Sequence, residues 1–488
     1  MKVKDLARLA VIKTNPHWPF SRLNKTPYYA AIKRFLKVIE KFPEIKSAYL
    51  RHGLLQKDWI PAISDIDITL ISDSSMDLTQ EFLFLRTFWN RFKKSKKLFP
   101  MLGEVDILTE DQTTFWTQFS IRGYEAKEWQ LLHGAKTLKL SYNARPKSLS
   151  LDSMDHALLC YLNLFHRQMY RTNHHPQLKL PEMKRFSSKI LRYVHYLDDY
   201  QTNGSPVPAK ARVSDLLFTL LVNFDQKVQT LSANQYFEQT PGWSIQSRNS
   251  HEWGRLQEID LLRLQELEPV KDVIESIVLS HNRDFVILKD VAHANQIEDL
   301  IDVIHRVFAP RNSRPLILTQ RLFDYVIQFH DPFLYTHLLR CGKIAFGGDP
   351  MSAVLPPDLS SFVRCVLKEI PNVLSFTQSD TLFNLFESET FQERMLDSMV
   401  ERALFIKLFL EKQWISPWQN EMLLATQEQY PEEQQKILKI KNMYGAQSTE
   451  AASFELFRYW KEITNSISTL LSRNLETESF LERSFMNT

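Results

Sequence analysis

Glycine is scarce in this chain, and its scarcity limits the folds that the chain can adopt. Eleven of the 488 residues are glycine, about a third of the roughly 7% that is usual in proteins. Folds that need glycine-rich loops or many tight turns, such as the doubly wound dinucleotide fold or a β-sandwich, are therefore disfavoured, and helices are favoured. Most of the glycines gather in two groups: Gly53, Gly103, Gly123 and Gly134, and later Gly342, Gly347 and Gly348. Each group is expected to mark backbone with an unusual φ or a close approach.

Composition and charge exclude several classes of protein. With 44% hydrophobic and 24% charged residues, the chain has an ordinary globular composition, and its length suits about three domains. Sixty Lys and Arg against fifty-seven Asp and Glu give a net charge of +3. This balance is unusual for a protein whose binding depends on many phosphate contacts, so nucleic acid is a disfavoured partner.

Cysteine usage and hydropathy predict a cytoplasmic protein. Cys160, Cys341 and Cys365 are far apart and show no CxxC or zinc-ligand spacing, so neither a disulfide framework nor a structural zinc site is expected. The cationic N-terminus has an apolar stretch too short for a signal peptide. Because no long continuous apolar run is present, we expect no membrane partner.

The first quarter of the chain alternates between helical and strand-like patterns. Apolar residues recur at helical spacing over 27–41 and 78–98. The segments 47–53, 64–72 and 104–109 are short and have the composition or alternation of strands. The order helix, strand, strand, helix, strand predicts a small α/β unit of about 120 residues.

Beyond residue 150 the pattern is mostly helical. Helices are expected at 151–170, 183–200, 211–233, 380–412 and 449–474, with a loop containing Pro176 and Pro181 and an irregular stretch at 234–256. A second α/β patch is expected from a strand at 284–290, a helix at 294–308 and a strand at 314–319. These patterns divide the chain into domains at 1–145, 151–235, 250–349 and 350–488.

The second α/β patch resembles the first in its residues. DITLISD (67–73) is similar to DFVILKD (284–290), PMLGEVDILTED (100–111) to RPLILTQR (314–321), and WQLLHGAK (129–136) to YTHLLRCGK (335–343). An internal duplication would explain these parallels. Chance similarity between two strand–helix–strand segments would explain them equally well.

Two aspartates on the expected strand at 64–72 indicate a candidate site. The strand alternates, so Asp65, Asp67 and Thr69 lie on one face, and Asp106 on the next strand completes a triad if the two strands are neighbours. Three carboxylates suit a hard divalent cation that leaves positions open for substrate phosphates. In a two-metal site, one ion would activate a hydroxyl and the other would hold the leaving pyrophosphate. A solvated strand face or a cap is the plainer interpretation of the same residues.

The segment YLRHGLLQKDWIPAISDIDITLI (49–71) resembles the signature of the DNA polymerase β-like nucleotidyltransferase superfamily. That signature is a hydrophobic residue with Gly-[Gly/Ser], a spacer, Asp-h-[Asp/Glu], and a later strand carboxylate. The strongest local match is DWIPAISDIDITLI (58–71). The resemblance covers residues 28–140 and implies a helical companion domain at 151–235.

The resemblance implies roles for individual residues. Asp65 and Asp67 would bind Mg²⁺ (or Mn²⁺), and Asp106 would be a third ligand or a general base. Gly53 would let the backbone approach the phosphates of a nucleoside triphosphate, with ATP the expected one, and Ser64 would lie at the edge of the site. Arg51 and Lys57 are plausible phosphate contacts outside the signature positions.

Some positions leave alternatives open. Either Leu54 follows Gly53 where a second small residue belongs, or Gly53 is that second residue and His52 replaces the first. Glu104 shares a strand face with Asp106 and is an alternative third carboxylate.

The second α/β patch lacks the metal ligands under this alignment. Asp284 matches Asp67, but Asn282 stands in place of Asp65 and Leu316 in place of Asp106. A repeat of this kind would serve as a scaffold or a substrate platform.

We interpret the chain as an α+β protein with a small mixed-sheet nucleotidyltransferase domain, helical domains, and a candidate degenerate second α/β unit. The expected reaction moves a nucleoside monophosphate from a triphosphate to a hydroxyl of a small molecule or a protein, releasing pyrophosphate. Two alternatives stay open: a non-catalytic nucleotide-binding scaffold, and a template-independent enzyme that extends RNA or oligonucleotides. The last would need a positive groove that includes Lys93–Lys97, although a basic run at the end of a helix is also typical of a solvated face.

Overall fold

The computed structural model describes residues 3–15, 17, 19–51, 53–55, 59–113, 121, 125–138, 146–171, 176–196, 211–233, 262–280, 283–290, 293–352, 354–375, 400–412, 419–446 and 449–476. The chain divides into two compact units, the first made of Leu6–Ala144 with Val366–Arg483 and the second containing Arg145–Cys365. Each unit contains one four-stranded mixed sheet among helices. The predicted α+β class is therefore confirmed.

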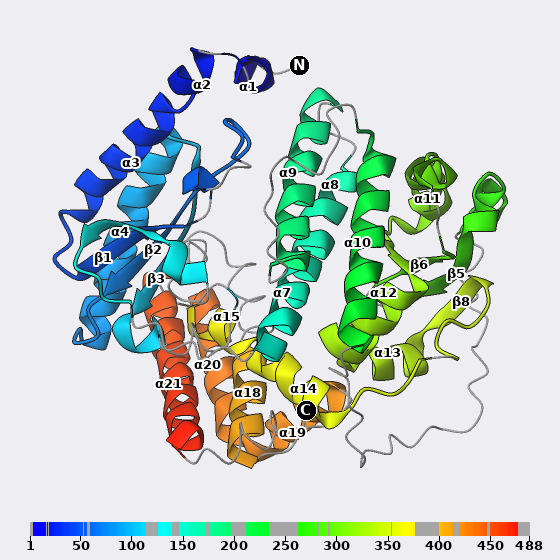
Figure 1. The fold of residues 1–488 in the computed structure, drawn as a ribbon. Coiled ribbons are helices and arrows are strands. Elements are labelled where there is room, and N and C mark those ends of the chain that lie inside the picture. Colours follow the sequence, from blue (N-terminus) through cyan, green and yellow to red (C-terminus); the bar gives the residue numbers. More distant parts are fainter. Residues whose placement is uncertain are drawn as a thin grey trace. The chain divides into compact units, whose positions relative to one another are not determined.

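The first sheet lies in the N-terminal part of the first unit (Figure 1). Its strands are β1 (Ile45–Leu50), β2 (Ile66–Ser72), β3 (Leu102–Thr109) and β4 (Gln130–Gly134), in the order β3-β2-β1-β4. β1 is antiparallel to β2 and β4, and β2 is parallel to β3. The three strands expected near 47–53, 64–72 and 104–109 are confirmed with small shifts, and β4 is an element that the sequence patterns did not predict.

Two helices pack beside this sheet and follow directly from their sequences. They are α3 (Thr26–Ile39) and α4 (Leu78–Leu98), and both were predicted. Asp77 caps α4, since its side chain accepts the N–H of Gln80 while the Gln80 side chain accepts the N–H of Asp77. Edge-to-face ring contacts, including Phe35–Phe88 at 6.3 Å, join α3 to α4.

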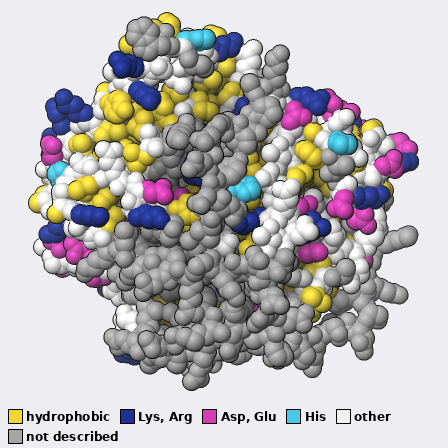
Figure 2. Space-filling model, in the orientation of Figure 1, with side chains coloured by type: hydrophobic (Ala, Val, Ile, Leu, Met, Phe, Trp, Pro, Cys, Tyr) yellow, Lys and Arg dark blue, Asp and Glu magenta, His cyan; other side chains and the backbone are white. Residues whose placement is uncertain are grey.

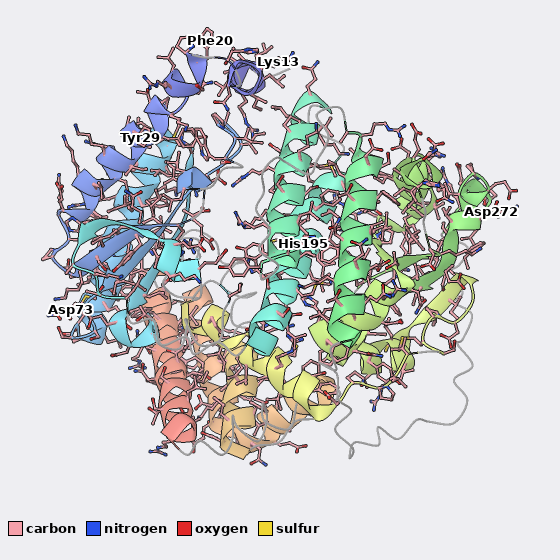
Figure 3. All side chains as sticks on the ribbon, in the orientation of Figure 1. Lys13, Phe20, Tyr29, Asp73, His195 and Asp272 are labelled. Atoms are coloured by element: carbon pink, nitrogen blue, oxygen red, sulfur yellow. The ribbon has the colours of Figure 1, made fainter. Side chains whose placement is uncertain are left out.

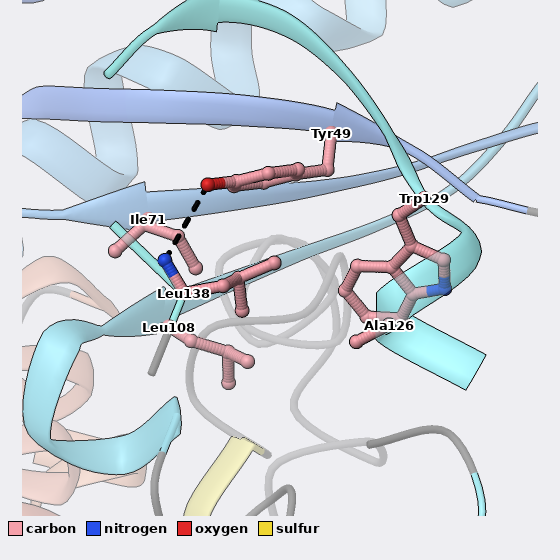
Figure 4. Close-up of a cluster of buried hydrophobic side chains, with 6 residues drawn as sticks. All are labelled: Tyr49, Ile71, Leu108, Ala126, Trp129 and Leu138. Carbon is pink, nitrogen blue, oxygen red and sulfur yellow. Dashed lines mark hydrogen bonds between the residues drawn. The ribbon is translucent and has the colours of Figure 1, made fainter. Parts of the chain in front are cut away.

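The pleat of the strands separates two faces of this sheet. Tyr49, Ile71 and Leu108 lie on one face, where they form a buried cluster with Ala126, Trp129 and Leu138 (Figure 4). Cross-strand partners share a face, and Tyr49 pairs with Thr69, which pairs with Asp106. The apolar cluster therefore continues into the face that carries the predicted site residues.

The helices of the C-terminal region complete the first unit. They are α15 (Ile370–Ser375), α18 (Glu401–Lys412), α19 (Gln419–Gln429), α20 (Pro431–Ala446) and α21 (Thr449–Glu476). α21 contacts α4 through Phe82, whose ring lies 5.1 Å from that of Phe454 and 5.4 Å from that of Phe457. The buried Glu81 accepts a hydrogen bond from Lys461 at 2.9 Å in the same interface. The helix expected at 449–474 is confirmed, whereas 380–399 lies outside the described residues.

The second sheet repeats the topology of the first. Its strands are β5 (Ile274–Leu279), β6 (Phe285–Leu288), β7 (Leu316–Thr319) and β8 (Lys343–Gly347), in the order β7-β6-β5-β8. β5 is antiparallel to β6 and β8, and β6 is parallel to β7. α11 (Leu300–Phe308) connects β6 to β7, as α4 connects β2 to β3. The strands at 284–290 and 314–319 and the helix at 294–308 were predicted; β5 and β8 were not.

Irregularities of the two sheets also coincide. Gly134 has a φ of +73° and Gly347 a φ of +77°, and a Cβ on either would lie 1.9 Å from a backbone oxygen of the neighbouring strand, that of Lys46 or Glu275. Ser47 is the strand partner of Gly134, and Ser276 is the strand partner of Gly347. In both sheets the register then shifts at the same place, between Ala48 and Tyr49 in β1 and between Ile277 and Val278 in β5. This agreement supports the parallels seen in the sequence, while descent of both units from one ancestor stays a prediction.

The remaining helices of the second unit include three of 15 to 21 residues, which are longer than those around its sheet. They are α7 (Pro146–Cys160), a π-helical turn η3 (Tyr161–Phe165), α8 (His166–Met169), α9 (Pro176–Val194) and α10 (Val213–Ala233). The predicted loop at Pro176 and Pro181 is wrong, because α9 begins at Pro176 and includes Pro181. Pro176 suits a first turn, where its missing N–H has no helical partner. The irregular stretch expected at 234–256 lies outside the described residues.

Polar side chains from η3 and α8 cover the open edge of the second sheet. β7 is an edge strand, so the carbonyl groups on its outer side have no partner strand and need other hydrogen-bond donors. The Tyr161 hydroxyl donates to Ile317 O at 2.6 Å, the Tyr170 hydroxyl donates to Pro315 O at 3.0 Å, and His166 Nε2 lies 2.7 Å from Pro315 O. Burial lowers the pKa of His166 to about 4, so its ring is neutral at physiological pH.

Short helices complete the description of the fold. They are α1 (Val3–Thr14), α2 (Phe20–Leu23), α12 (Gln320–Tyr325), η9 (Val326–His330), α13 (Phe333–Cys341) and α14 (Leu359–Leu367). Among the helices that the structure describes, none combines the length and the hydropathy needed to cross a bilayer.

Candidate functional site

Four acidic side chains lie at one edge of the first sheet, near the N-terminal ends of β2 and β3. We call Asp65, Asp67, Glu104 and Asp106 the carboxylate edge. The N–H of Glu104 donates to Asp67 Oδ1 at 3.1 Å, and Asp106 is the cross-strand partner of Thr69. Because β2 and β3 are neighbours, the condition set for the triad of Asp65, Asp67 and Asp106 is met, although among the described residues these three carboxylates are not gathered into a metal-binding group.

Gly103 fixes how closely the two strands approach at this edge. A Cβ at this position would lie 2.5 Å from Asp65 Cβ and 2.5 Å from Asp67 Oδ1. Any larger residue would therefore displace both aspartates. The approach coincides with a register shift between Ile66 and Ile68 of β2. The sequence marks Gly103 only as one of a group of glycines, and its place beside the two aspartates is what the structure adds.

A tightly bonded turn leads into Asp65. Ser64 N donates to Ile60 O at 2.8 Å, and Ile60 N donates to Ser64 Oγ at 2.9 Å. The hydroxyl of Tyr28 accepts the N–H of Ala62 at 2.8 Å and donates to Ser64 O at 3.0 Å. These bonds hold Ala62 at a φ of +64°, a conformation that costs a residue with a side chain about 1–2 kcal/mol. The turn thus has one defined conformation from which β2 begins.

Arg51 lies at the end of β1 and is paired with two of the carboxylates. Its Nη1 donates to Asp106 Oδ2 at 2.6 Å and its Nη2 to Glu104 Oε2 at 3.3 Å. The side chains of Arg51 and Asp106 are 1% and 8% exposed, whereas that of Glu104 is 49% exposed. Removing one partner of such a buried pair costs about 3–5 kcal/mol. Arg51, predicted as a phosphate contact, therefore neutralises Asp106 in this structure.

Two buried polar atoms beside this pair have no hydrogen-bond partner among the described residues. They are Nε of Arg51 and Oγ1 of Thr69. The guanidinium of Arg51 also lies 6.0 Å from the centre of the Trp129 ring, at the border of the apolar cluster. Buried donors and hydroxyls normally find a partner, so these atoms offer polar contacts to a water molecule or a ligand.

The other predicted site residues have different surroundings. Gly53 begins the short helical turn η1 (Gly53–Leu55) after β1. Ser64 is buried, and its hydroxyl serves the turn before β2. Lys57 and His52 lie outside the described residues. Nucleotide contacts by Gly53, Ser64 and Lys57 therefore stay predictions.

The donor atoms of the carboxylate edge are carboxylate oxygens, which hard cations such as Mg²⁺ and Mn²⁺ prefer as ligands. Asp65 and Asp67 flank Gly103 and could be shared by one ion. Asp106 instead faces Arg51, and within the described part of the chain no three His, Cys, Asp or Glu side chains are gathered to hold a metal ion. Asp65 and Asp67 thus fit a cation, whereas Asp106 as a third ligand would require a changed contact with Arg51.

The corresponding edge of the second sheet is closed by a different ion pair. Arg311 donates through Nε to Asp284 Oδ2 at 2.9 Å, and Ser280 N donates to Asp284 Oδ1 at 3.1 Å. The loop between β5 and β6 has five residues, whereas fifteen separate β1 from β2. The segment that carries Gly53 and Ser64 in the first unit therefore has no room in the second.

The strand registers correct one sequence alignment. Phe285 pairs with Val278 as Thr69 pairs with Tyr49, so Asp284 corresponds to Ile68 and not to Asp67. DITLISD and DFVILKD look alike because both are seven residues long and begin and end with Asp, although their strands differ by one position in register. Leu316 is the partner of Phe285, as Asp106 is the partner of Thr69, so the match of Leu316 with Asp106 is confirmed.

Two buried carboxyl groups of the second unit were not anticipated from the sequence. Burial raises the pKa of Asp225 to about 6, although the hydrogen bond from Thr319 opposes the shift. Burial likewise raises the pKa of Asp324 to about 6 against the hydrogen bond from Gln320. Thr319 ends β7, so Asp225 of α10 is bonded to the end of that strand. Gln320 and Asp324 both belong to α12, and their hydrogen bond lies within that helix.

Comparison with known proteins adds no assignment: no family model, curated protein or solved structure matches this chain. Any function must therefore be argued from the residues of the carboxylate edge.

Proposed function

We propose that this chain is a metal-dependent nucleotidyltransferase that moves a nucleoside monophosphate from a triphosphate, ATP being the expected one, to a hydroxyl of a small molecule or a protein. The observation that supports this most directly is the place of Gly103 beside Asp65 and Asp67, where a Cβ would lie 2.5 Å from Asp65 Cβ and 2.5 Å from Asp67 Oδ1. The two aspartates are two positions apart at the start of β2, and its parallel neighbour β3 carries Glu104 and Asp106. The arrangement of β1, β2 and β3 agrees with the resemblance of residues 49–71 to the polymerase β-like signature.

The proposal gives each part of the edge a task. A divalent cation held by Asp65 and Asp67 would neutralise triphosphate charge and favour release of pyrophosphate. The turn at Ile60–Ser64 holds the chain entering β2 in one conformation, which orients Asp65. Arg51 holds the Asp106 carboxylate and supplies a fixed positive charge at the same edge. For Asp106 to accept a proton or to bind a cation, the proton or the cation would have to compete with the guanidinium of Arg51 for the carboxylate.

A nucleotide-binding scaffold is the second candidate, and a specific contact favours it. The Arg51–Asp106 pair is short and nearly fully buried, so the third carboxylate is already neutralised. A triphosphate could then bind near Arg51 and Asp65 without transfer. The two candidates differ in one measurable respect, because only the enzyme releases pyrophosphate.

Pyrophosphate release from each of the four ribonucleoside triphosphates, with Mg²⁺ or Mn²⁺ and a cell extract as the source of acceptors, tests the proposal. Asp67→Asn should lower release about a hundredfold or more, because it removes a charged ligand. Asp73→Asn is the matched control: Asp73 follows the other end of β2 and pairs with Lys46 at 2.7 Å, and its loss should leave the rate unchanged.

The result separates the candidates. Release that is lost in Asp67→Asn and kept in Asp73→Asn supports the enzyme. Nucleotide binding by calorimetry without release by the wild type supports the scaffold. A wild type that neither binds nucleotide nor releases pyrophosphate would contradict both candidates. Equal pyrophosphate release by Asp67→Asn and Asp73→Asn would also contradict both.

A further inference from the structure

The N-terminal helices of the first unit expose an unusual number of large apolar side chains. Leu6, Phe20, Leu23 and Tyr29 are 51%, 46%, 58% and 60% exposed. They are four of the twelve exposed large hydrophobic side chains within the described residues, yet they fall within 24 positions of the chain. Figure 3 shows Phe20 and Tyr29 on the outer side of α2 and α3. Clustering of this kind indicates an interaction surface, whereas scattered exposed residues do not.

The same segment carries only positive charge. Residues 6–39 contain seven Lys or Arg and no Asp or Glu. On α3, Lys33, Arg34 and Lys37 are exposed, and Lys33 and Lys37 follow Tyr29 at helical spacing. Within the described part of the chain, neither these three residues nor Lys13 and Arg22 form an ion pair. Figure 2 shows Lys and Arg side chains beside hydrophobic ones at the upper left, over α1–α3. The surface is therefore complementary to an anionic partner.

We propose that this surface binds the face of an anionic lipid membrane, in place of the expectation from hydropathy that the chain has no membrane partner. The surface is defined by Leu6, Lys13, Phe20, Arg22, Leu23, Tyr29, Lys33, Arg34 and Lys37. A bilayer interface accepts leucine, phenylalanine and tyrosine side chains together, while lysine and arginine reach the headgroups. Anionic headgroups attract such basic residues within about a Debye length of the surface. The proposal is independent of the nucleotidyltransferase proposal.

The apolar side chains favour a membrane over nucleic acid. Single-stranded nucleic acid binds to aromatic rings, on which its bases stack, and to basic residues. Leu6 and Leu23 have no ring and would gain nothing from such a ligand, yet both are more than half exposed. Burial in the interface of a bilayer accounts for the leucines, the aromatic residues and the charges at once.

The proposal is tested with the full chain by flotation with vesicles of phosphatidylcholine, with and without phosphatidylglycerol. The wild type should bind the anionic vesicles and lose binding as salt is raised. Phe20→Ser with Leu23→Ser should lower the partition constant by about tenfold or more, as should Lys33→Gln with Arg34→Gln and Lys37→Gln. Leu424→Ser with Leu438→Ser is the matched control, since these leucines of α19 and α20 are 55% and 59% exposed. Melting curves confirm that each variant is folded.

Three results would overturn the proposal. The first is that the wild type does not bind anionic vesicles at low salt. The second is that the control variant loses as much vesicle binding as the Phe20 and Leu23 variant. The third is that the wild type binds labelled single-stranded RNA and that the Lys33, Arg34 and Lys37 variant binds RNA more weakly but vesicles as well as the wild type, which would assign the surface to nucleic acid.

Discussion

Replacing Gly347 by alanine tests the close approach that closes the second sheet. At a φ of +77°, an alanine loses about 1–2 kcal/mol relative to its preferred backbone conformation. Its Cβ would also lie 1.9 Å from Glu275 O, where real contacts are hardly ever shorter than 3.0 Å, so β5 and β8 must separate by about 1 Å. Losing two backbone hydrogen bonds adds about 2 kcal/mol. We therefore expect Gly347→Ala to destabilise the pairing of β5 and β8 by about 3–4 kcal/mol.

Hydrogen–deuterium exchange of the full chain measures this effect where it occurs. A loss of about 3 kcal/mol corresponds to roughly a hundredfold faster exchange of the amides of β5 and β8. Gly348→Ala is the neighbouring control, since a Cβ there meets no atom within 4 Å, and it should leave exchange nearly unchanged. Gly134→Ala should have the same effect on β1 and β4, because its Cβ would approach Lys46 O as closely.

If the amides of Gly347→Ala exchange like those of Gly348→Ala, the positive φ and the close contact at Gly347 do not constrain the sheet. A large effect of Gly347→Ala together with no effect of Gly134→Ala would contradict the structural equivalence of the two sheets.

Two further predictions concern stability. The folded pKa of His166, about 4, lies below the unfolded value of about 6.5, so the unfolded chain binds the extra proton first as pH falls. Stability should drop between pH 6.5 and 4 by up to about 3 kcal/mol; His166→Gln should flatten this dependence in urea unfolding, and an unchanged slope would refute the assignment. Tyr28→Phe removes the hydroxyl bonded to Ala62 and Ser64 and should lower the free energy of unfolding by about 1–3 kcal/mol; a loss no larger than that of exposed Tyr29→Phe would argue against the contact.

Strands with a buried alternating pattern were the predictable part of the fold. β2 and β3 alternate in sequence, with Asp67 and Asp106 among their apolar residues, so both strands followed from sequence. That the two strands are neighbours was only a condition of the triad, and the sheet order supplies it. β4 and β8 are edge strands with half-exposed side chains, and such strands lack the pattern that burial imposes. β5 is buried nearly throughout, and its short hydrophobic run gave no alternation to recognise.

The contacts of the candidate site were less predictable than its location. Arg51 and Asp106 are 55 residues apart, and no spacing rule connects a residue at the end of β1 with one in β3. Tyr28 and Ala62 are 34 residues apart and meet only because α3 lies beside the turn. Gly103 was noticed because glycine is rare here, although its contact with Asp65 and Asp67 depends on the register of two strands.

The first unit is discontinuous, and this has a consequence for synthesis on the ribosome. α4 is complete about 350 residues before α21 begins, which at 5–20 residues per second corresponds to roughly 20–70 s. Throughout this interval the nascent chain holds Glu81 and Phe82 without the helix that later covers them. The main segment of the second unit, Arg145–Cys365, is made within this interval. The helix α4, which leads into β3 of the candidate site, is therefore covered on the side of Glu81 and Phe82 only after α21 has been made.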